Sequence, residues 1–148
     1  MLVDLVLGVA TMLLCLLLQL LLLVVSLRFY LRHRHMVRTG SFARGLELIG
    51  GVMLLLLLGN LTQIAIWAGL FLQLEEFGRF SAAFYHSAVN FSTLGYGDVV
   101  MSPRHRLLGP LESLNGILMI GVSTSSLTWG VQHAIKTALQ ARGVDLEL

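Results

Sequence analysis

The chain has 148 residues, of which 56% are hydrophobic and only 12% are charged, and its mean hydropathy is +0.82. A soluble domain carries about a quarter charged residues, so this composition excludes an ordinary soluble globular protein. The formal charge of +2 is too small for a nucleic-acid-binding protein, which must neutralise many phosphates. The composition predicts a protein that lies in the lipid bilayer.

The first apolar run extends from Leu5 to Leu27 without a charged side chain. A helix of this length measures roughly 35 Å, enough to cross the ~30 Å hydrocarbon core. We therefore predict a transmembrane helix within residues 1–27. We expect it to be retained, because only the acidic Asp4 precedes the run and no small-residue cleavage site follows it. The single cysteine, Cys15, lies inside the run, which excludes an intrachain disulfide.

A basic segment, residues 28–45, follows the first run and holds Arg28, Arg32, Arg34, Arg38 and Arg44. Short loops rich in arginine stay in the cytoplasm. We therefore predict an amino terminus outside, a cytoplasmic tail over residues 136–148, and a location in the plasma membrane. The same arginines could contact anionic lipid headgroups, although topology alone accounts for them.

Two further uncharged runs predict two further spans. The run from Leu48 to Leu74 predicts a helix within residues 46–74, and the run from Ser113 to Ile135 predicts a helix over residues 110–135. Pro110 suits the first turn of that last helix.

The segment between these spans, residues 77–106, is too short to cross as one helix and return as another. Ser81 is a candidate N-cap, and residues 81–91 predict a helix of roughly 15 Å, half a membrane deep. A half-span helix followed by non-helical chain would leave backbone groups unpaired in lipid, but it is allowed along a water-filled path. The pattern predicts a re-entrant loop at a pore.

The residues after this short helix suit cation binding. Gly95 and Gly97 alternate with Leu94 and Tyr96, and glycine visits backbone angles that let successive carbonyls point the same way. A dehydrated cation could exchange its water shell for the carbonyls of residues 93–96, and the Thr93 hydroxyl could add a further ring. The negative carboxyl end of the short helix would favour a cation in the cavity below.

The sequence Thr93-Leu94-Gly95-Tyr96-Gly97-Asp98 resembles the selectivity-filter signature of tetrameric potassium channels, and the likeness covers Leu48 to about Gln132. It implies an all-α membrane protein that forms a homotetramer, with three transmembrane helices, one of them additional to the family's two, and a re-entrant pore helix. It also implies a pore domain over residues 46–135, divided into outer helix 46–74, pore helix 81–91, filter 92–98 and inner helix 110–135. Potassium ions (K⁺) would bind at Thr93, Leu94, Gly95 and Tyr96, with no organic cofactor.

The resemblance further implies side chains that support the filter, and we assign this role to His86, Ser92 and Asp98. His86 precedes Asp98 by twelve residues, a spacing at which the family places a side chain able to bond Asp98 or the Tyr96 hydroxyl. We predict that His86 braces the filter and makes it pH-sensitive. The alternative is a partly buried histidine without a regulatory role. Val89 stands where some members carry an acidic residue, so Asp98 needs another partner.

The inner-helix segment Leu111-Glu112-Ser113-Leu114-Asn115-Gly116 resembles the start of that helix in prokaryotic inward rectifiers. An acid inside a span is costly and therefore a candidate functional residue. Glu112 could pair with the pore helix of its own or a neighbouring subunit, or lie at the outer interface, and we favour a structural role. The candidate cavity and gate residues are Gly116, Ile120, Gly121, Thr124 and Thr128. The alternative for the two glycines is close helix packing.

Together these features predict a potassium-selective channel whose partners are copies of itself and membrane lipids, without nucleic acid. We do not expect an enzyme, because the sequence contains no nucleophile–base pair, metal cluster or phosphate-binding loop. The first span lacks the regularly spaced arginines of a voltage sensor. Two alternatives remain open: a weakly selective monovalent cation channel, and a non-conducting channel-like regulatory or assembly subunit.

Overall fold

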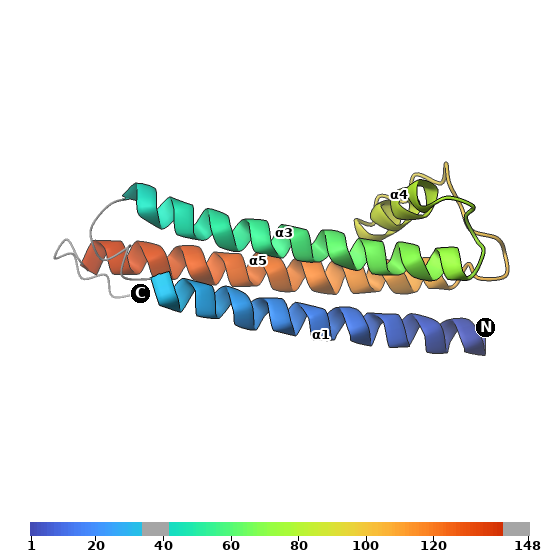
Figure 1. Ribbon diagram of the computed structural model, residues 1–148, viewed down its shortest axis with the longest axis horizontal. Coiled ribbons are helices and arrows are strands. Elements are labelled where there is room, and N and C mark those ends of the chain that lie inside the picture. The colour runs from blue at the N-terminus through green and yellow to red at the C-terminus, as the bar shows by residue number, and fades with distance from the viewer. Residues whose placement is uncertain (34–41, 141–148) are drawn as a thin grey trace. The chain divides into compact units, whose positions relative to one another are not determined.

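A computed structural model describes residues 1–33 and 42–140, and within these ranges the chain is all-α (Figure 1). Its helices are α1 (Leu2–His33), α3 (Phe42–Gln73), α4 (Phe80–Phe91) and α5 (Leu108–Gln140). Three helices are long and α4 is short, in the order that the sequence predicts. Arg34, Arg38 and tail residues 141–148 lie outside the described residues.

Two helices of the described chain are long and apolar enough to cross a membrane. They are α1, over Leu2–His33, and α3, over Glu47–Gln73, and they correspond to the first two predicted spans. Helix α5 is equally long but less apolar, because Glu112, Asn115 and several Ser and Thr residues between positions 123 and 128 interrupt it. The third span therefore stays a prediction.

The start of α4 differs from the prediction. Arg79, not Ser81, is the N-cap, with extended φ −141° and ψ 141°, and no side chain caps this end. The predicted Ser81 cap is wrong because the chain is already helical at Phe80, whose ring lies 5.7 Å from that of Phe84 one turn later. Ser81 instead lies in the first turn.

The described chain divides into two compact units. Unit 1 contains residues 1–19 and 59–121, and therefore includes the beginning of α1, the end of α3, all of α4 and the beginning of α5. Unit 2 contains residues 20–58 and the described residues from 122 onward. The predicted pore helix and filter both belong to unit 1.

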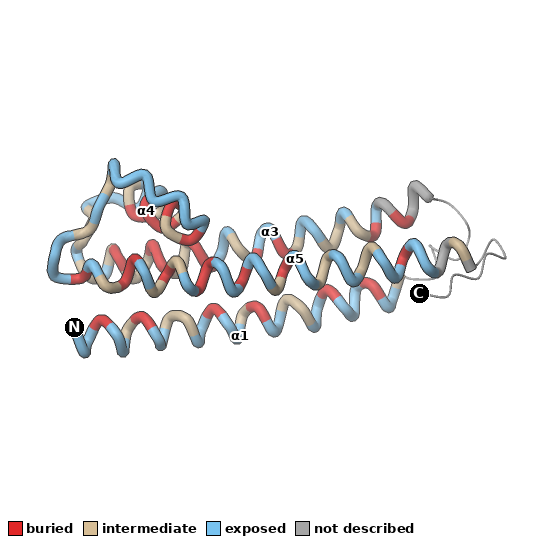
Figure 2. Tube along the Cα trace, turned by 180° about the vertical axis from the view of Figure 1, so that it is seen from behind, coloured by how far each residue is buried: buried red, intermediate tan, exposed pale blue. Residues whose placement is uncertain are grey.

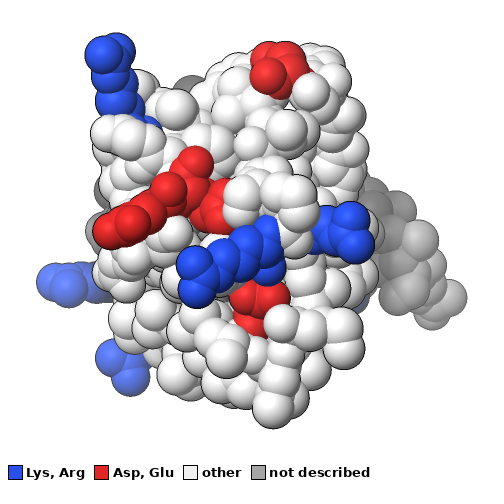
Figure 3. Space-filling model, turned by 90° about the vertical axis from the view of Figure 1, so that its right-hand side faces the viewer, with Lys and Arg blue, Asp and Glu red and all other residues white. Residues whose placement is uncertain are grey.

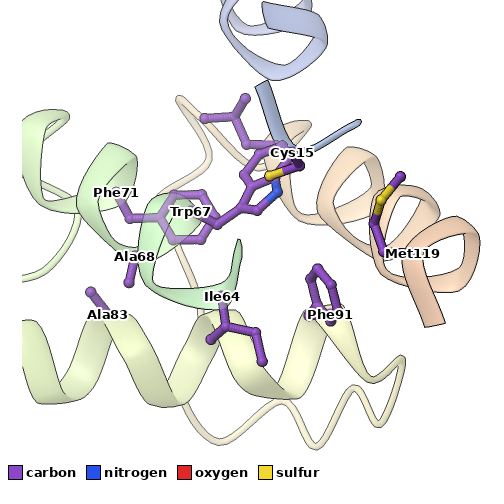
Figure 4. Close-up of a cluster of buried hydrophobic side chains, with 9 residues drawn as sticks. Cys15, Ile64, Trp67, Ala68, Phe71, Ala83, Phe91 and Met119 are labelled. Atoms are coloured by element: carbon purple, nitrogen blue, oxygen red, sulfur yellow. The ribbon is translucent and has the colours of Figure 1, made fainter. Parts of the chain in front are cut away.

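The core of unit 1 forms where α4 meets the end of α3 and the beginning of α5 (Figure 2). Trp67 and Phe71 of α3 are fully buried at its centre, and Ala83 allows α4 to approach them. Phe91 of α4 and Cys15 of α1 complete the contact (Figure 4). Four helices thus share one apolar core, against which α4 packs one face through Ala83 and Phe91.

Unit 2 has a smaller aromatic contact. Tyr30 of α1 is buried, and its ring meets the rings of Trp129 and His133 of α5 at 6.0 and 5.8 Å. Trp129 and His133 stack on each other at 5.2 Å. These rings join α1 to α5 within this unit.

Gly116 lets α5 pack directly on the end of α4. A Cβ atom at this position would overlap the carbonyl group of Phe91, which is backbone and cannot move aside. A Cβ atom at Gly121 would meet no atom of the described chain within 4 Å. The structure therefore supports close packing as the role of Gly116 and leaves Gly121 unconstrained.

Replacing Gly116 with alanine should destabilise the fold, because the added methyl group must displace the end of α4. Overpacking of this kind costs about 1–3 kcal/mol. Thermal unfolding of the purified protein in detergent, followed by circular dichroism, would measure the loss. Gly121→Ala is the matched control on the same helix and should unfold close to the native temperature. Equal melting of both variants would contradict the assignment.

Candidate functional site

Helix α4 is fixed by hydroxyl groups as well as by apolar packing. Ser87, on its buried face, has its Oγ 2.8 Å from the carbonyl oxygen of Ile64 in α3 and in hydrogen-bond contact with Glu112 Oε1 of α5. Ser113 of α5 donates to the Asn90 carbonyl at 2.9 Å. At roughly 18 Å, α4 is too short to span a membrane, and these bonds hold it against both long helices.

The end of α4 leads the chain directly into the predicted filter. The Leu94 amide donates to the Val89 carbonyl, and the Thr93 amide donates to the Asn90 carbonyl, both at 2.9 Å. These two bonds form a Schellman motif in which Thr93 takes the left-handed position, at φ 61°. Glycine or asparagine normally occupies that position, and a β-branched residue is strained there. Ser92 Oγ also donates to the Ala88 carbonyl, at 2.6 Å.

The backbone after Thr93 alternates in handedness. Gly95 and Gly97 have φ of 59° and 73°, whereas Leu94 and Tyr96 between them keep ordinary negative φ. Such alternation lets successive carbonyl groups face one side, whereas carbonyls in a strand face opposite sides in turn. Residues 92–98 form neither helix nor strand, and all are exposed in the single chain, with Tyr96 66% exposed. This backbone pattern would allow the carbonyl oxygens of the segment to form a row.

Asp98 is held by Tyr85. The phenol of Tyr85 donates to Asp98 Oδ2 at 2.7 Å, and the Val99 amide donates to Oδ1 at 3.0 Å. The bond from Tyr85 is the main reason that the pKa of Asp98 lies below its ordinary value, because it stabilises the charged carboxylate. Tyr85 fixes the chain just beyond the predicted filter to the outward face of α4.

His86 does not make the bond predicted for it. Its Nδ1 lies 2.7 Å from the Val99 carbonyl, and its Nε2 lies 2.9 Å from the amide nitrogen of Asn90. The prediction of a bond to Asp98 or to the Tyr96 hydroxyl is wrong because successive residues of a helix point about 100° apart. Tyr85 faces Asp98, and His86 is turned inward against Phe71, at 5.5 Å between ring centres.

Both ring nitrogens of His86 make hydrogen bonds. With the Asn90 amide nitrogen donating to Nε2, the ring proton is on Nδ1 and is donated to the Val99 carbonyl. His86 is 6% exposed. It therefore braces the chain that leaves the predicted filter, through a backbone carbonyl rather than through Asp98. Tyr85 was missed as a site residue, and its spacing of thirteen from Asp98 is the signal that could have identified it.

Glu112 contacts the short helix of its own chain, which is one of the three placements that the sequence left open. Among the candidate cavity and gate residues, Gly116 is buried against α4, and the others are exposed in the single chain: Ile120, Gly121, Thr124 and Thr128. The Thr128 hydroxyl donates back to the Thr124 carbonyl at 2.9 Å. Gly116 therefore differs from the other residues predicted to line the cavity, because it is buried against α4 and they are exposed.

The arginines predicted to face lipid headgroups are only partly described. Arg28 and Arg32 are exposed in the last turns of α1, and Arg44 lies in the first turn of α3. Among the described residues, no group of three or more His, Cys, Asp or Glu side chains is placed to hold a metal ion. Cation binding at the site would therefore depend on backbone oxygens.

Comparison with known proteins identifies the family. A family model described as "Ion channel" matches residues 48–129, which is more than half of the chain. The match begins in α3, covers α4 and the segment after it, and ends in α5. Searches of curated proteins and of solved structures found no match. The chain therefore belongs to the ion channel family and is a membrane protein.

Proposed function

We propose that the chain is one subunit of a homotetrameric potassium-selective channel. K⁺ would be coordinated by carbonyl oxygens of Thr93, Leu94, Gly95 and Tyr96, with Gly97 completing the turn. The observation that carries this proposal is the left-handed φ at every second residue, 93, 95 and 97, directly after a half-span helix. Rings of such oxygens replace the water shell of an ion that crosses the membrane.

The exposure of this segment supports assembly around an axis. Leu94 and Tyr96 are 57% and 66% exposed, although both side chains are large. The backbone of residues 94–97 forms neither helix nor strand, so it is stable only beside water, ions or other protein. Neighbouring copies of the same segment would cover these side chains and leave the carbonyls facing the axis.

The contacts at one end of unit 1 support the predicted topology. Asp4, near the amino terminus, accepts a hydrogen bond from His105, with 2.7 Å between Oδ1 and Nδ1. His105 lies in the turn between the predicted filter and α5. The amino terminus and residues 77–106 would then lie on the same side of the membrane. We propose that this side is the exterior of a plasma membrane channel, because the basic segment, residues 28–45, is predicted to be cytoplasmic. Charged side chains of both signs lie on this end (Figure 3), as expected for a surface in water.

The packing of α5 supports a specific gate. Gly116 is occupied by its contact with Phe91, so bending there would break the packing of α4. A Cβ atom added to Gly121 would meet no atom of the described chain within 4 Å, outside the backbone of its own helix. We therefore place the bend at Gly121, and the cavity along Ile120, Thr124 and Thr128.

Ion flux tests the proposed function directly. The purified chain in liposomes should conduct K⁺, with block by Ba²⁺, and its reversal potential in mixed solutions should favour K⁺ over Na⁺. Gly95→Ala should abolish selectivity. Alanine at φ 59° destabilises this backbone conformation by about 1–2 kcal/mol, and in a homotetramer all four subunits would contain the substitution. Gly78→Ala is the control, a glycine of the preceding loop with ordinary φ and open space. Equal permeation of Na⁺ and K⁺ would indicate a weakly selective cation channel instead. Absence of ion flux would indicate a non-conducting regulatory or assembly subunit. Either outcome would overturn the proposal.

The bond between Tyr85 and Asp98 should set the acid sensitivity of the filter. A carboxylate whose pKa is lowered in the folded protein contributes stability that is lost as the pH falls through that pKa. Tyr85→Phe removes the main cause of the lowering, so Asp98 should become protonated at a higher pH. K⁺ flux measured against external pH should therefore fail at higher pH in Tyr85→Phe than in the native channel. Tyr30→Phe, in unit 2, should leave the profile unchanged, and an unshifted profile in Tyr85→Phe would exclude this role.

A further inference from the structure

Glu112 is the most deeply buried acid of unit 1, with no exposed surface. None of the ion pairs among the described residues includes it. Its Oε1 contacts the Ser87 hydroxyl, and its Oε2 has no hydrogen-bond partner among the residues that the structure describes. A buried carboxylate normally requires a cation or several donors. The Ser87 hydroxyl and the nearby Asn90 amide are both neutral, and two neutral groups are too little to hold a negative charge in the interior of a membrane protein.

The hydroxyl of Ser87 has a single proton, and this decides whether Ser87 or Glu112 is the hydrogen-bond donor in their contact. Ser87 Oγ carries one proton but lies against two oxygens, the Ile64 carbonyl at 2.8 Å and Glu112 Oε1. The Ile64 carbonyl can only accept, so the serine proton must point to it. If Ser87 donated to Glu112 instead, the lone pairs of Ser87 and Ile64 would face each other. The second proton at this junction must therefore come from Glu112.

We propose that Glu112 is a neutral carboxylic acid whose O–H donates to Ser87 Oγ, and that it is a positioning residue for the short helix before the filter. Ser87 then donates onward to Ile64, so one chain of two hydrogen bonds joins α5, α4 and α3. The unpartnered Oε2 becomes an ordinary carbonyl oxygen of the acid, which is far less costly to bury than half of a carboxylate.

The groups around Glu112 fit a neutral acid. Ser87 and Asn90 face it from α4, and Asn115 lies one turn further along α5. Two titratable groups of the described chain lie near these residues. Cys15, on α1, is a buried free thiol close to Asn115, and His86, on α4, bonds to Asn90. No cation among these groups would favour ionisation. If Glu112 did ionise, the Ser87 proton would turn toward it and α4 would lose its bond to Ile64.

Infrared spectroscopy of the purified protein tests the proton itself. Above about pH 6 an ordinary glutamate is ionised, so a carboxylic-acid carbonyl band that persists above that pH identifies a buried protonated acid. The native chain should show this band and Glu112→Gln should lack it. Glu76→Gln is the matched control, because Glu76 is partly exposed and accepts two bonds from Ser102, at 2.7 and 2.6 Å. That variant should lose only carboxylate absorption. A native spectrum without the acid band would overturn the proposal.

Ion flux tests the positioning role, which rests on the proposed channel function. Glu112→Gln keeps a donor at the same place, so K⁺ flux and selectivity should stay close to native. Glu112→Ala and Ser87→Ala each break the chain of bonds, and flux per folded protein should fall by about tenfold, the effect of losing one buried hydrogen bond. Native-like flux in both alanine variants would overturn the role. The acid band is measured without ion flux, so the two proposals can fail separately. A protein that shows the band but does not conduct would refute only the proposed channel function. A selective channel that lacks the band would refute only the proposal about Glu112.

Discussion

The constraint on which this structure depends is that backbone polar groups in a membrane must be paired. The chain leaves its helical state at residue 92, in the middle of the segment between two long helices. The amides of Thr93 and Leu94, just after the helix, are still paired because they donate hydrogen bonds to carbonyls in the last turn of α4. The Gly95 amide makes a longer bond to the Val89 carbonyl, at 3.5 Å, and among the described residues the amides of residues 96–98 donate no hydrogen bond to a backbone carbonyl. Such a segment is stable only next to water, ions or protein, which is why a pore is the environment that explains it.

Polar contacts between helices are the second consequence of that environment. Apolar surfaces gain little by meeting each other in lipid, so close approach and hydrogen bonds decide which helices associate. The first part of α1 packs in unit 1 both through a hydrogen bond and through a close approach. Its Gln19 accepts a bond from Gln63 of α3 at 2.8 Å, and its Gly8 lies so close to Leu111 of α5 that a Cβ atom would overlap that side chain. Within unit 1, α1 is therefore an integral part of the packing, although the family match begins only in α3.

The limits of prediction from sequence follow from the same contacts. Long uncharged runs locate α1 and α3, because length and apolarity are properties of the sequence itself. The choice between Tyr85 and His86 as the partner of Asp98 is different, since the two residues are adjacent and point about 100° apart around α4. Spacing alone does not set the rotation of a helix about its axis. Packing does, here by turning His86 toward Phe71. Glu112 likewise had three possible partners until the position of α4 selected Ser87.

The contacts between α5 and α4 follow one another closely along both helices, and this has a mechanical consequence. Glu112 contacts Ser87, Ser113 donates to Asn90, and Gly116 packs on Phe91. Three contacts thus join residues 112–116 of α5 to residues 87–91 of α4. A bend at Gly121 lies beyond the last of these contacts. In the proposed channel, opening such a gate would leave the short helix and the segment after it in place, so conduction could be switched without disturbing the carbonyl oxygens proposed to select the ion.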